Sequence, residues 1–142
     1  MALFSQTARW TSRTLPQEQA NQPRRLLVVD DDKKGAQAIA ASLCSSGYDA
    51  QFALGGPAVL LVIARWMPEI AVLDINMPCI DGFTLARQLR NEVRTQRIIL
   101  LAFTAYDEIT IQTNGIAAGF DGYCQKGTGP APLLRLLEQM TA

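Results

Sequence analysis

The strongest constraint on the fold is an alternation along the chain between short apolar runs and longer segments with helical periodicity. The apolar runs span residues 26–29, 50–54, 70–73, 98–103 and 120–124. Each run is short enough to be a β-strand, and a continuously apolar strand is typical of a sheet that is covered on both faces. Helical periodicity predicts helices over residues 34–45, 57–66, 83–92, 107–117 and 132–140.

The strict order of strand, helix, strand predicts an α/β domain in which parallel strands are joined by right-handed crossovers. We therefore expect a doubly wound, five-stranded parallel sheet with helices on both faces. A length of 142 residues corresponds to one domain, and a hydrophobic content of 49% excludes a disordered chain.

The composition excludes several classes of function. The chain has no histidine, so histidine cannot act as a base or as a metal ligand. The 13 basic and 13 acidic residues leave no net positive charge for direct nucleic-acid binding. The apolar run 58–64 is far shorter than the roughly 20 residues that span a bilayer, so we expect no membrane insertion. The 3 cysteines form no Cys-x-x-Cys pair, which favours a reducing, cytoplasmic location.

The first residues differ from the remainder in charge. Residues 1–25 contain four arginines and one glutamate, without the apolar core of a secretory signal. We expect residues 1–23 to be a flexible N-terminal extension and residues 24–142 to be the folded domain, with an organellar transit peptide as the less favoured alternative. Whether Leu3, Phe4 and Trp10 dock onto the domain or onto a partner stays open.

Polar residues follow the apolar runs where parallel strands should end. In an open parallel sheet, ligands bind outside the carboxyl ends of the strands. The residues at these ends are Asp30, Asp31, Asp32, Asp74, Thr104 and Lys126. Crowded carboxylates repel one another and favour a bound cation, and oxygen donors alone favour Mg²⁺. Helix N-caps are the simpler interpretation of Asp32, Asp81 and Asp107.

Four segments, LLVVDDD, AVLDINMPCIDG, LLAFTA and GFDGYCQKG, occur in this order and spacing. Together they resemble the receiver domain of two-component response regulators, of the chemotaxis-regulator type, over residues 24–140. The resemblance implies a flavodoxin-like strand order 2-1-3-4-5 and a receiver domain over residues 24–142.

The resemblance also implies a role for each residue at the strand ends. Asp74 would be the phosphoacceptor, acting with Thr104 and Lys126. Asp30 and Asp31, chosen over Asp31 and Asp32, would be the acidic pair. With Asp74 and the backbone carbonyl of Asn76, they would hold Mg²⁺.

Further positions complete the implied machinery. Asn76, Ala105 and Lys126 would contact the phosphoryl group. Thr104 would be the switch hydroxyl, and Tyr123 the aromatic residue whose rotamer follows it. The side chains of Asn76 and Tyr106 would flank the hydrolytic water.

The implied function is a phosphoacceptor switch, not a turnover enzyme, that receives phosphoryl from a histidine kinase or phosphotransfer protein and acts on a downstream protein. The family usually has proline and an aromatic residue after the lysine, where this chain has Gly127 and Thr128. We therefore expect a trans peptide and either unusual geometry or disorder there, and a receiver-like binding module with a silent switch is the alternative. A haloacid-dehalogenase-type phosphohydrolase is weaker still, because position 76 lacks the required acid.

Two predicted helices have more apolar surface than one core-facing stripe requires. The helix over 57–66 is apolar almost all round, and either Trp66 with nearby loops or a partner should cover it. The helix over 132–140 is leucine-rich, which favours a kinase contact or a homodimer. The helix over 107–117 contains poor helix formers and should be labile.

Overall fold

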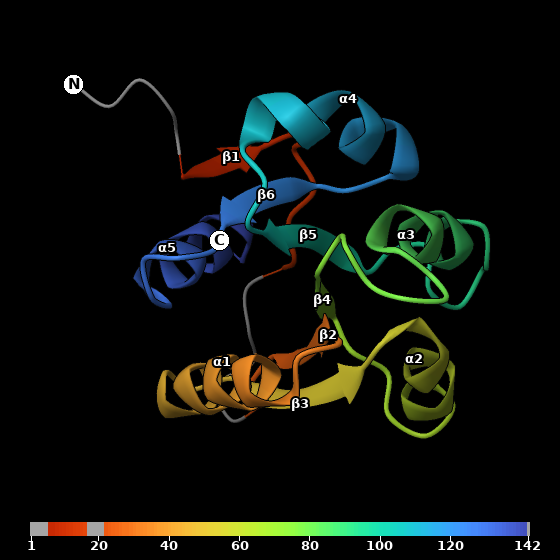
Figure 1. Ribbon diagram of the computed structural model, residues 1–142. Helices are drawn as coiled ribbons and strands as arrows, with labels where there is room; N and C mark the ends of the chain where they lie inside the picture. Colours follow the sequence, from red (N-terminus) through yellow and green to blue (C-terminus); the bar gives the residue numbers. More distant parts are fainter. Residues whose placement is uncertain (1–5, 17–21, 142) are drawn as a thin grey trace.

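The computed structural model describes residues 6–16 and 22–141, which form a sheet between two layers of helices (Figure 1). Within these residues the sheet has six strands in the order β1-β6-β5-β4-β2-β3. The strands are β1 (Thr7–Arg9), β2 (Arg25–Asp30), β3 (Asp49–Leu54), β4 (Ile70–Leu73), β5 (Ile99–Thr104) and β6 (Gly122–Gln125). Neighbouring strands from β3 to β6 are all parallel, which confirms the expected order 2-1-3-4-5 for that part of the sheet.

The helices divide between the two faces of the sheet. Helices α1 (Lys33–Ser45) and α5 (Ala131–Met140) cover one face, and α2 (Gly56–Ile63), α3 (Gly82–Arg90) and α4 (Glu108–Ala118) cover the other (Figure 1). Side chains alternate along each strand, so Leu26 and Val28 enter the core beneath α1 and α5, whereas Leu27 and Val29 enter the opposite core. Both β4 and β5 are buried along their whole length, as the apolar runs predict.

Aspartate side chains begin two of the helices. Asp81 accepts a hydrogen bond from the Thr84 N–H at 2.8 Å, and Asp107 accepts one from the Thr110 N–H at 2.9 Å. Both predicted N-caps are confirmed. Asp32 occupies the N-cap position of α1, but its side chain makes no capping hydrogen bond.

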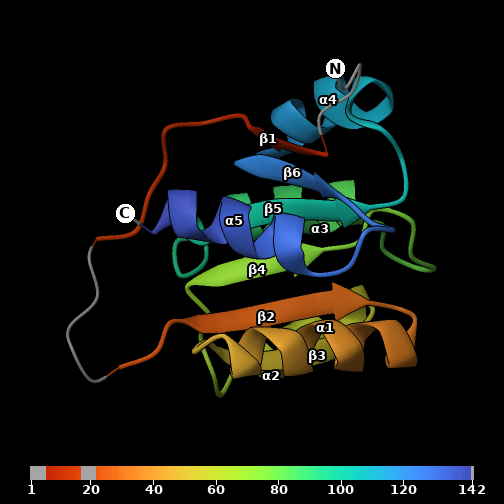
Figure 2. The ribbon, with the colours of Figure 1, turned by 90° about the vertical axis from the view of Figure 1, so that its left-hand side faces the viewer.

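Strand β1 lies where the sequence predicts a flexible extension. It pairs antiparallel with β6, placing Thr7 opposite Cys124 and Arg9 opposite Gly122 (Figure 2). Three residues are too few for an alternating pattern that would predict a strand from the sequence. The strand forms because the edge of β6 offers unpaired backbone N–H and C=O groups to which residues 7–9 bind. Trp10 packs against the core of the domain itself, whereas Leu3 and Phe4 lie outside the described residues.

The chain after β1 runs past the end of α5 (Figure 2). The Leu15 N–H donates to the Met140 carbonyl at 2.9 Å, and the Leu15 side chain packs against the core beneath α5. Leu133, Leu136 and Met140 are buried within the chain. Most of the leucine-rich surface predicted to make a kinase contact or a homodimer is thus already covered within the chain.

Helix α2 remains partly uncovered. Leu60 is 51% exposed and Leu61 is 70% exposed, although Val59 and Val62 face the core. Trp66 packs against that core but leaves this outer face of α2 open.

Candidate functional site

Four adjacent parallel strands end at one edge of the sheet and bring together acidic, hydroxyl and ammonium groups. Strand β2 ends at Asp30, Asp74 follows β4, β5 ends at Thr104, and Lys126 follows β6. Because β2 pairs with β4, β4 with β5, and β5 with β6 in parallel, these ends are neighbours in space.

Three of these side chains form an acidic cluster. One carboxylate oxygen from each of Asp30, Asp31 and Asp74 lies within 4.8 Å of the others. Asp30 is buried and Asp31 is exposed, while the side chain of Asp74 keeps 12% exposure. The acceptor candidate is therefore reachable from solvent, although most of its carboxylate is covered.

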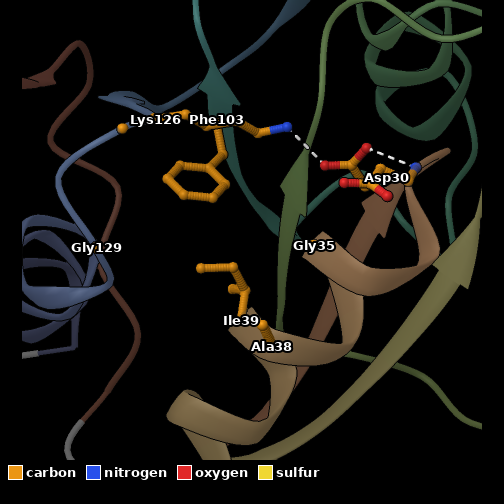
Figure 3. A pocket seen from close by; sticks show the side chains of 9 residues that line it. Asp30, Gly35, Ala38, Ile39, Phe103, Lys126 and Gly129 are labelled. Carbon is orange, nitrogen blue, oxygen red and sulfur yellow. Dashed lines mark hydrogen bonds and ion pairs between the residues drawn. The ribbon is translucent and has the colours of Figure 1, made fainter.

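Lys126 points into the acidic cluster from the end of β6. Its Nζ donates a hydrogen bond to Asp30 Oδ2 at 2.6 Å (Figure 3). The same Nζ lies 3.4 Å from Asp74 Oδ2. Its backbone N–H donates to the Thr104 carbonyl at 2.8 Å, and Nζ lies 5.6 Å from the centre of the Phe103 ring. These contacts anchor the lysine from both its backbone and its side chain.

The loop after Lys126 has the unusual geometry that the sequence predicts. Gly127 and Gly129 have φ angles of 118° and 78°, in the left-handed region that favours glycine, and no cis peptide occurs among the described residues. Lys126 thus stays beside the acids although glycine follows it in a left-handed conformation.

The charges shift one another's proton affinities in different directions. Burial alone would raise the pKa of Asp30, but hydrogen bonds from Lys126 and the Asp32 N–H lower it below its ordinary value. Burial, with repulsion from Asp30, raises the pKa of Asp74 to about 6 against the opposing effect of Lys126. Burial would lower the pKa of Lys126, but its hydrogen bond to Asp30 and the charge of Asp74 raise it.

The donor set fits Mg²⁺. Asp30, Asp31 and Asp74 offer oxygen atoms only, which hard divalent cations prefer, and their mutual repulsion is relieved by a cation. Asn76 lies two residues after Asp74 in the same loop, and its side chain is exposed.

A chain of hydrogen bonds runs from Thr104 to Tyr123. Thr104 Oγ1 accepts a hydrogen bond from the Tyr106 N–H at 3.3 Å, and the Tyr106 carbonyl accepts one from the Tyr123 hydroxyl at 2.6 Å. Ala105 is exposed between them, and its carbonyl accepts a hydrogen bond from Gln125 Nε2 at 3.2 Å. Tyr123 itself is buried and faces inward.

Two hollows flank the acidic cluster. One, of about 330 Å³, is lined by Asn76, Tyr106 and residues of α3 and α4. The other, of about 250 Å³, lies between α1 and the end of β6, with Ile39 and Phe103 on its walls and Asp30 and Lys126 at its rim (Figure 3). Both leave space for groups that approach from solvent.

Two residues outside the acidic cluster, Gly82 and Asp121, have structural roles that the sequence motifs do not reveal. An added Cβ at Gly82 would collide with the Asp74 carbonyl and would lie 2.8 Å from Ile75 Cα, so this position holds the Asp74 loop against α3. Asp121 is 1% exposed and accepts hydrogen bonds from Arg90 Nη2 at 2.6 Å and the Leu100 N–H at 2.9 Å. An acid inside the apolar run 120–124 is the signal that marks it.

A five-stranded parallel core with acids and a lysine at its carboxyl edge defines a receiver-type α/β domain. Residues 26–138 match the family model described as the response regulator receiver domain, and the chain belongs to that family.

Relatives of known name and solved structures agree with this assignment. The chain is 38% identical over 120 residues to the response regulator MprA of Mycobacterium sp. (strain KMS), covering 84% of this chain and 50% of the relative. A solved putative response regulator from Chloroflexus aurantiacus J-10-fl is 30% identical, with a TM-score of 0.76 over 84% of this chain and 98% of that one.

A third similarity concerns the metal. The receiver domain of a sensor histidine kinase from Pseudomonas aeruginosa PAO1, described with a magnesium ion coordinated in its active-site cleft, is 25% identical. Its TM-score is 0.74, and the match covers 83% of this chain and 97% of that one.

The chain spans 50% of the length of the mycobacterial relative. In the part of the chain that the structure describes, no helix has both the length and the apolar character needed to cross a bilayer.

Proposed function

We propose that this chain is a phosphoacceptor switch that receives a phosphoryl group on Asp74 from a histidine kinase or a histidine phosphotransfer protein. The observation that carries the proposal is the cluster of Asp74 with Asp30, Asp31 and Lys126 at one edge of the sheet. Asp74 follows a buried strand, and its side chain is partly exposed. Its carboxylate is therefore accessible to a phosphoryl donor and does not serve as a helix cap.

The transfer step needs little covalent chemistry from the protein. A carboxylate oxygen of Asp74 attacks phosphorus in line, a new O–P bond forms, and the P–N bond to the donor histidine breaks. The electron pair of that bond stays on the leaving imidazole. Lys126 would hold a phosphoryl oxygen, as would the backbone amide of Ala105.

A divalent cation belongs in this proposal because the acceptor and the phosphoryl group are both anionic. Asp30, Asp31, Asp74 and the Asn76 carbonyl would hold Mg²⁺, which reduces the repulsion between the two anions. The ammonium of Lys126, which lies beside Asp30 and Asp74, already offsets part of the negative charge of the two carboxylates.

The switch would be read through Thr104 and Tyr123. A hydrogen bond from the Thr104 hydroxyl to the phosphoryl group draws the loop after β5 inward and favours the buried position of Tyr123. The altered surface would then bind a downstream protein in the cytoplasm. Hydrolysis of the aspartyl phosphate, with Asn76 and Tyr106 beside the path of water, resets the chain without making it a turnover enzyme.

Labelling with acetyl phosphate tests the proposal. With Mg²⁺ present, the intact mass should rise by one phosphoryl group, and hydroxylamine should release the label as it does from an acyl phosphate. The chain has no histidine, so the label cannot be a phosphohistidine. Asp74→Asn should abolish labelling, whereas Asp49→Asn, an exposed acid on β3, should not. A folded wild-type chain without label and without Mg²⁺ affinity would support the silent binding module instead.

A further inference from the structure

Trp10, which follows β1, lies against the inward-facing Tyr123. The two rings are stacked with their centres 5.9 Å apart and an angle of 17° between their planes. Trp10 Nε1 donates a hydrogen bond to Glu108 Oε2 at 2.9 Å, at the start of α4. Gly115 of α4 leaves room for the ring, because an added Cβ there would lie 2.7 Å from Trp10 Cζ3.

The backbone on both sides of Trp10 is anchored to the edge of β6. Residues 7–9 pair with β6, and the Gln125 N–H donates to the Gln6 carbonyl at 2.7 Å. The Trp10 and Thr11 N–H groups both donate to the Asp121 carbonyl, at 2.8 and 3.2 Å. Residues 7–9 thus form an added edge strand of the sheet, and Trp10 follows it as an aromatic anchor (Figure 1).

Continuous contacts connect this anchor to the acidic cluster. The ring of Tyr123 stacks against Trp10, and its hydroxyl donates a hydrogen bond to the Tyr106 carbonyl. Tyr106 is bonded through its N–H to Thr104, whose carbonyl accepts the Lys126 N–H. Both partners of Trp10, namely Tyr123 and Glu108, therefore adjoin the loop that the proposed switch moves.

We propose that residues 6–13 are an internal ligand of the surface formed by β6 and α4, and that docking of Trp10 holds Tyr123 inward and so strengthens phosphoryl binding at Asp74. The inference rests on the function proposed above. The docked segment and the phosphoryl group favour the same buried position of Tyr123, so each raises the affinity for the other by an equal factor.

Gly115→Ala is the sharpest test, because the added methyl displaces the Trp10 ring without changing any residue of the segment 6–13 or of the acidic cluster. We expect beryllofluoride with Mg²⁺, measured by fluorine NMR, to bind about 5-fold or more weakly, the lower range of typical coupling between sites. Thr113→Ala, at an exposed position of the same helix, is the matched control and should bind as the wild type does.

Two variants at position 10 provide an independent measurement. Trp10→Ala should weaken beryllofluoride binding as Gly115→Ala does, and Trp10→Phe, which keeps a stacked ring, should restore most of the affinity. Urea denaturation of each variant verifies that the affinity is measured on a folded chain.

If docking of the segment strengthens phosphoryl binding, then binding of a phosphoryl mimic must strengthen docking of the segment, and this effect can be measured by hydrogen exchange. Beryllofluoride should slow hydrogen exchange at the backbone amides of residues 7–11 in the wild type by a factor similar to the loss of affinity in Gly115→Ala.

The outcomes separate the two proposals. If acetyl phosphate labels Asp74 but Gly115→Ala and Trp10→Ala bind beryllofluoride as tightly as the wild type or more tightly, the internal-ligand proposal is overturned and the phosphoacceptor function stands. If Asp74 is never labelled in the folded wild-type chain, the phosphoacceptor function itself fails.

Discussion

The ammonium of Lys126 lies 2.6 Å from Asp30 Oδ2, closer than its 3.4 Å distance to Asp74 Oδ2. This preference keeps Asp30 anionic, because the hydrogen bond from Lys126 helps to lower its pKa despite burial. Asp74 receives less stabilisation and has its pKa raised by burial and by Asp30. Burial and the unequal contact with Lys126 thus shift the pKa values of the two acids in opposite directions.

Replacing Lys126 with methionine should separate metal binding from phosphoryl transfer. Without the ammonium, the negative charge of the carboxylates is no longer partly neutralised, and Mg²⁺ meets no neighbouring positive charge. The affinity for Mg²⁺ should therefore rise about 3-fold or more. Labelling by acetyl phosphate should slow by about 10-fold or more, because the phosphoryl oxygens lose a cationic partner. Calorimetry with Mg²⁺ and the rate of mass increase measure the two effects, with the exposed Lys34→Met as the control. Labelling at the wild-type rate would contradict this role of Lys126.

Asp121→Ala should be strongly destabilising. The carboxylate is buried and bonded to the guanidinium of Arg90, to Arg13 and to the Leu100 N–H, and all three lose their acceptor. The free energy of unfolding should fall by about 3 kcal/mol or more, as when one partner of a buried ion pair is removed. Urea denaturation measures the change, and Asp49→Ala at an exposed position should change it by about 0.5 kcal/mol or less.

Gly82→Ala should damage the site from outside it. The added methyl meets the Asp74 carbonyl and the Ile75 backbone, neither of which can rotate away as a side chain can. We expect a loss of about 1–3 kcal/mol in unfolding free energy, together with slower labelling of Asp74. Gly35→Ala, whose methyl meets only the side chain of Asp32, is the control. Equal labelling rates in the two variants would show that Gly82 does not position Asp74.

Tyr123 should make stability decline at alkaline pH. Burial, followed by the charge of Asp107, raises the pKa of this hydroxyl from 10.0 to about 12. The unfolded chain therefore loses the proton before the folded chain does, so the stabilising contribution is complete below pH 10 and disappears as the pH rises through about 12. Urea denaturation between these pH values should show a steeper decline for the wild type than for Tyr123→Phe. The half-exposed Tyr106→Phe should decline as the wild type does.

Much of the fold was predictable because local pattern and global topology agree. The run 70–73 coincides with strand β4, and the other predicted strands differ from the observed ones by no more than two residues at either end. Parallel strands must leave their carboxyl ends at one edge, so Asp30, Asp74 and Thr104 meet there once the order of strands is given. Helix α2 was harder, because an all-apolar segment does not show which side faces the core.

The contacts of the N-terminal segment could not be predicted in the same way. Residues 7–9 carry no periodic signal, and their partner β6 is more than a hundred residues away in the sequence. Trp10 contacts Tyr123 and Glu108 only because β6 and α4 are neighbours in the folded chain.

The amino-acid sequence alone determined the α/β class, the order of strands and helices, and which acids, hydroxyl and lysine gather at the sheet edge, since these follow from periodicity and from residues adjacent to each strand. Only the tertiary structure decided that the Lys126 ammonium lies closer to Asp30 than to Asp74, that Asp121 is buried with several hydrogen-bond donors around it, and that residues 7–9 add an edge strand to the sheet. The physical reason is that hydrophobic periodicity is local, whereas packing and pairing choose among partners distant along the chain by shape and hydrogen-bonding capacity.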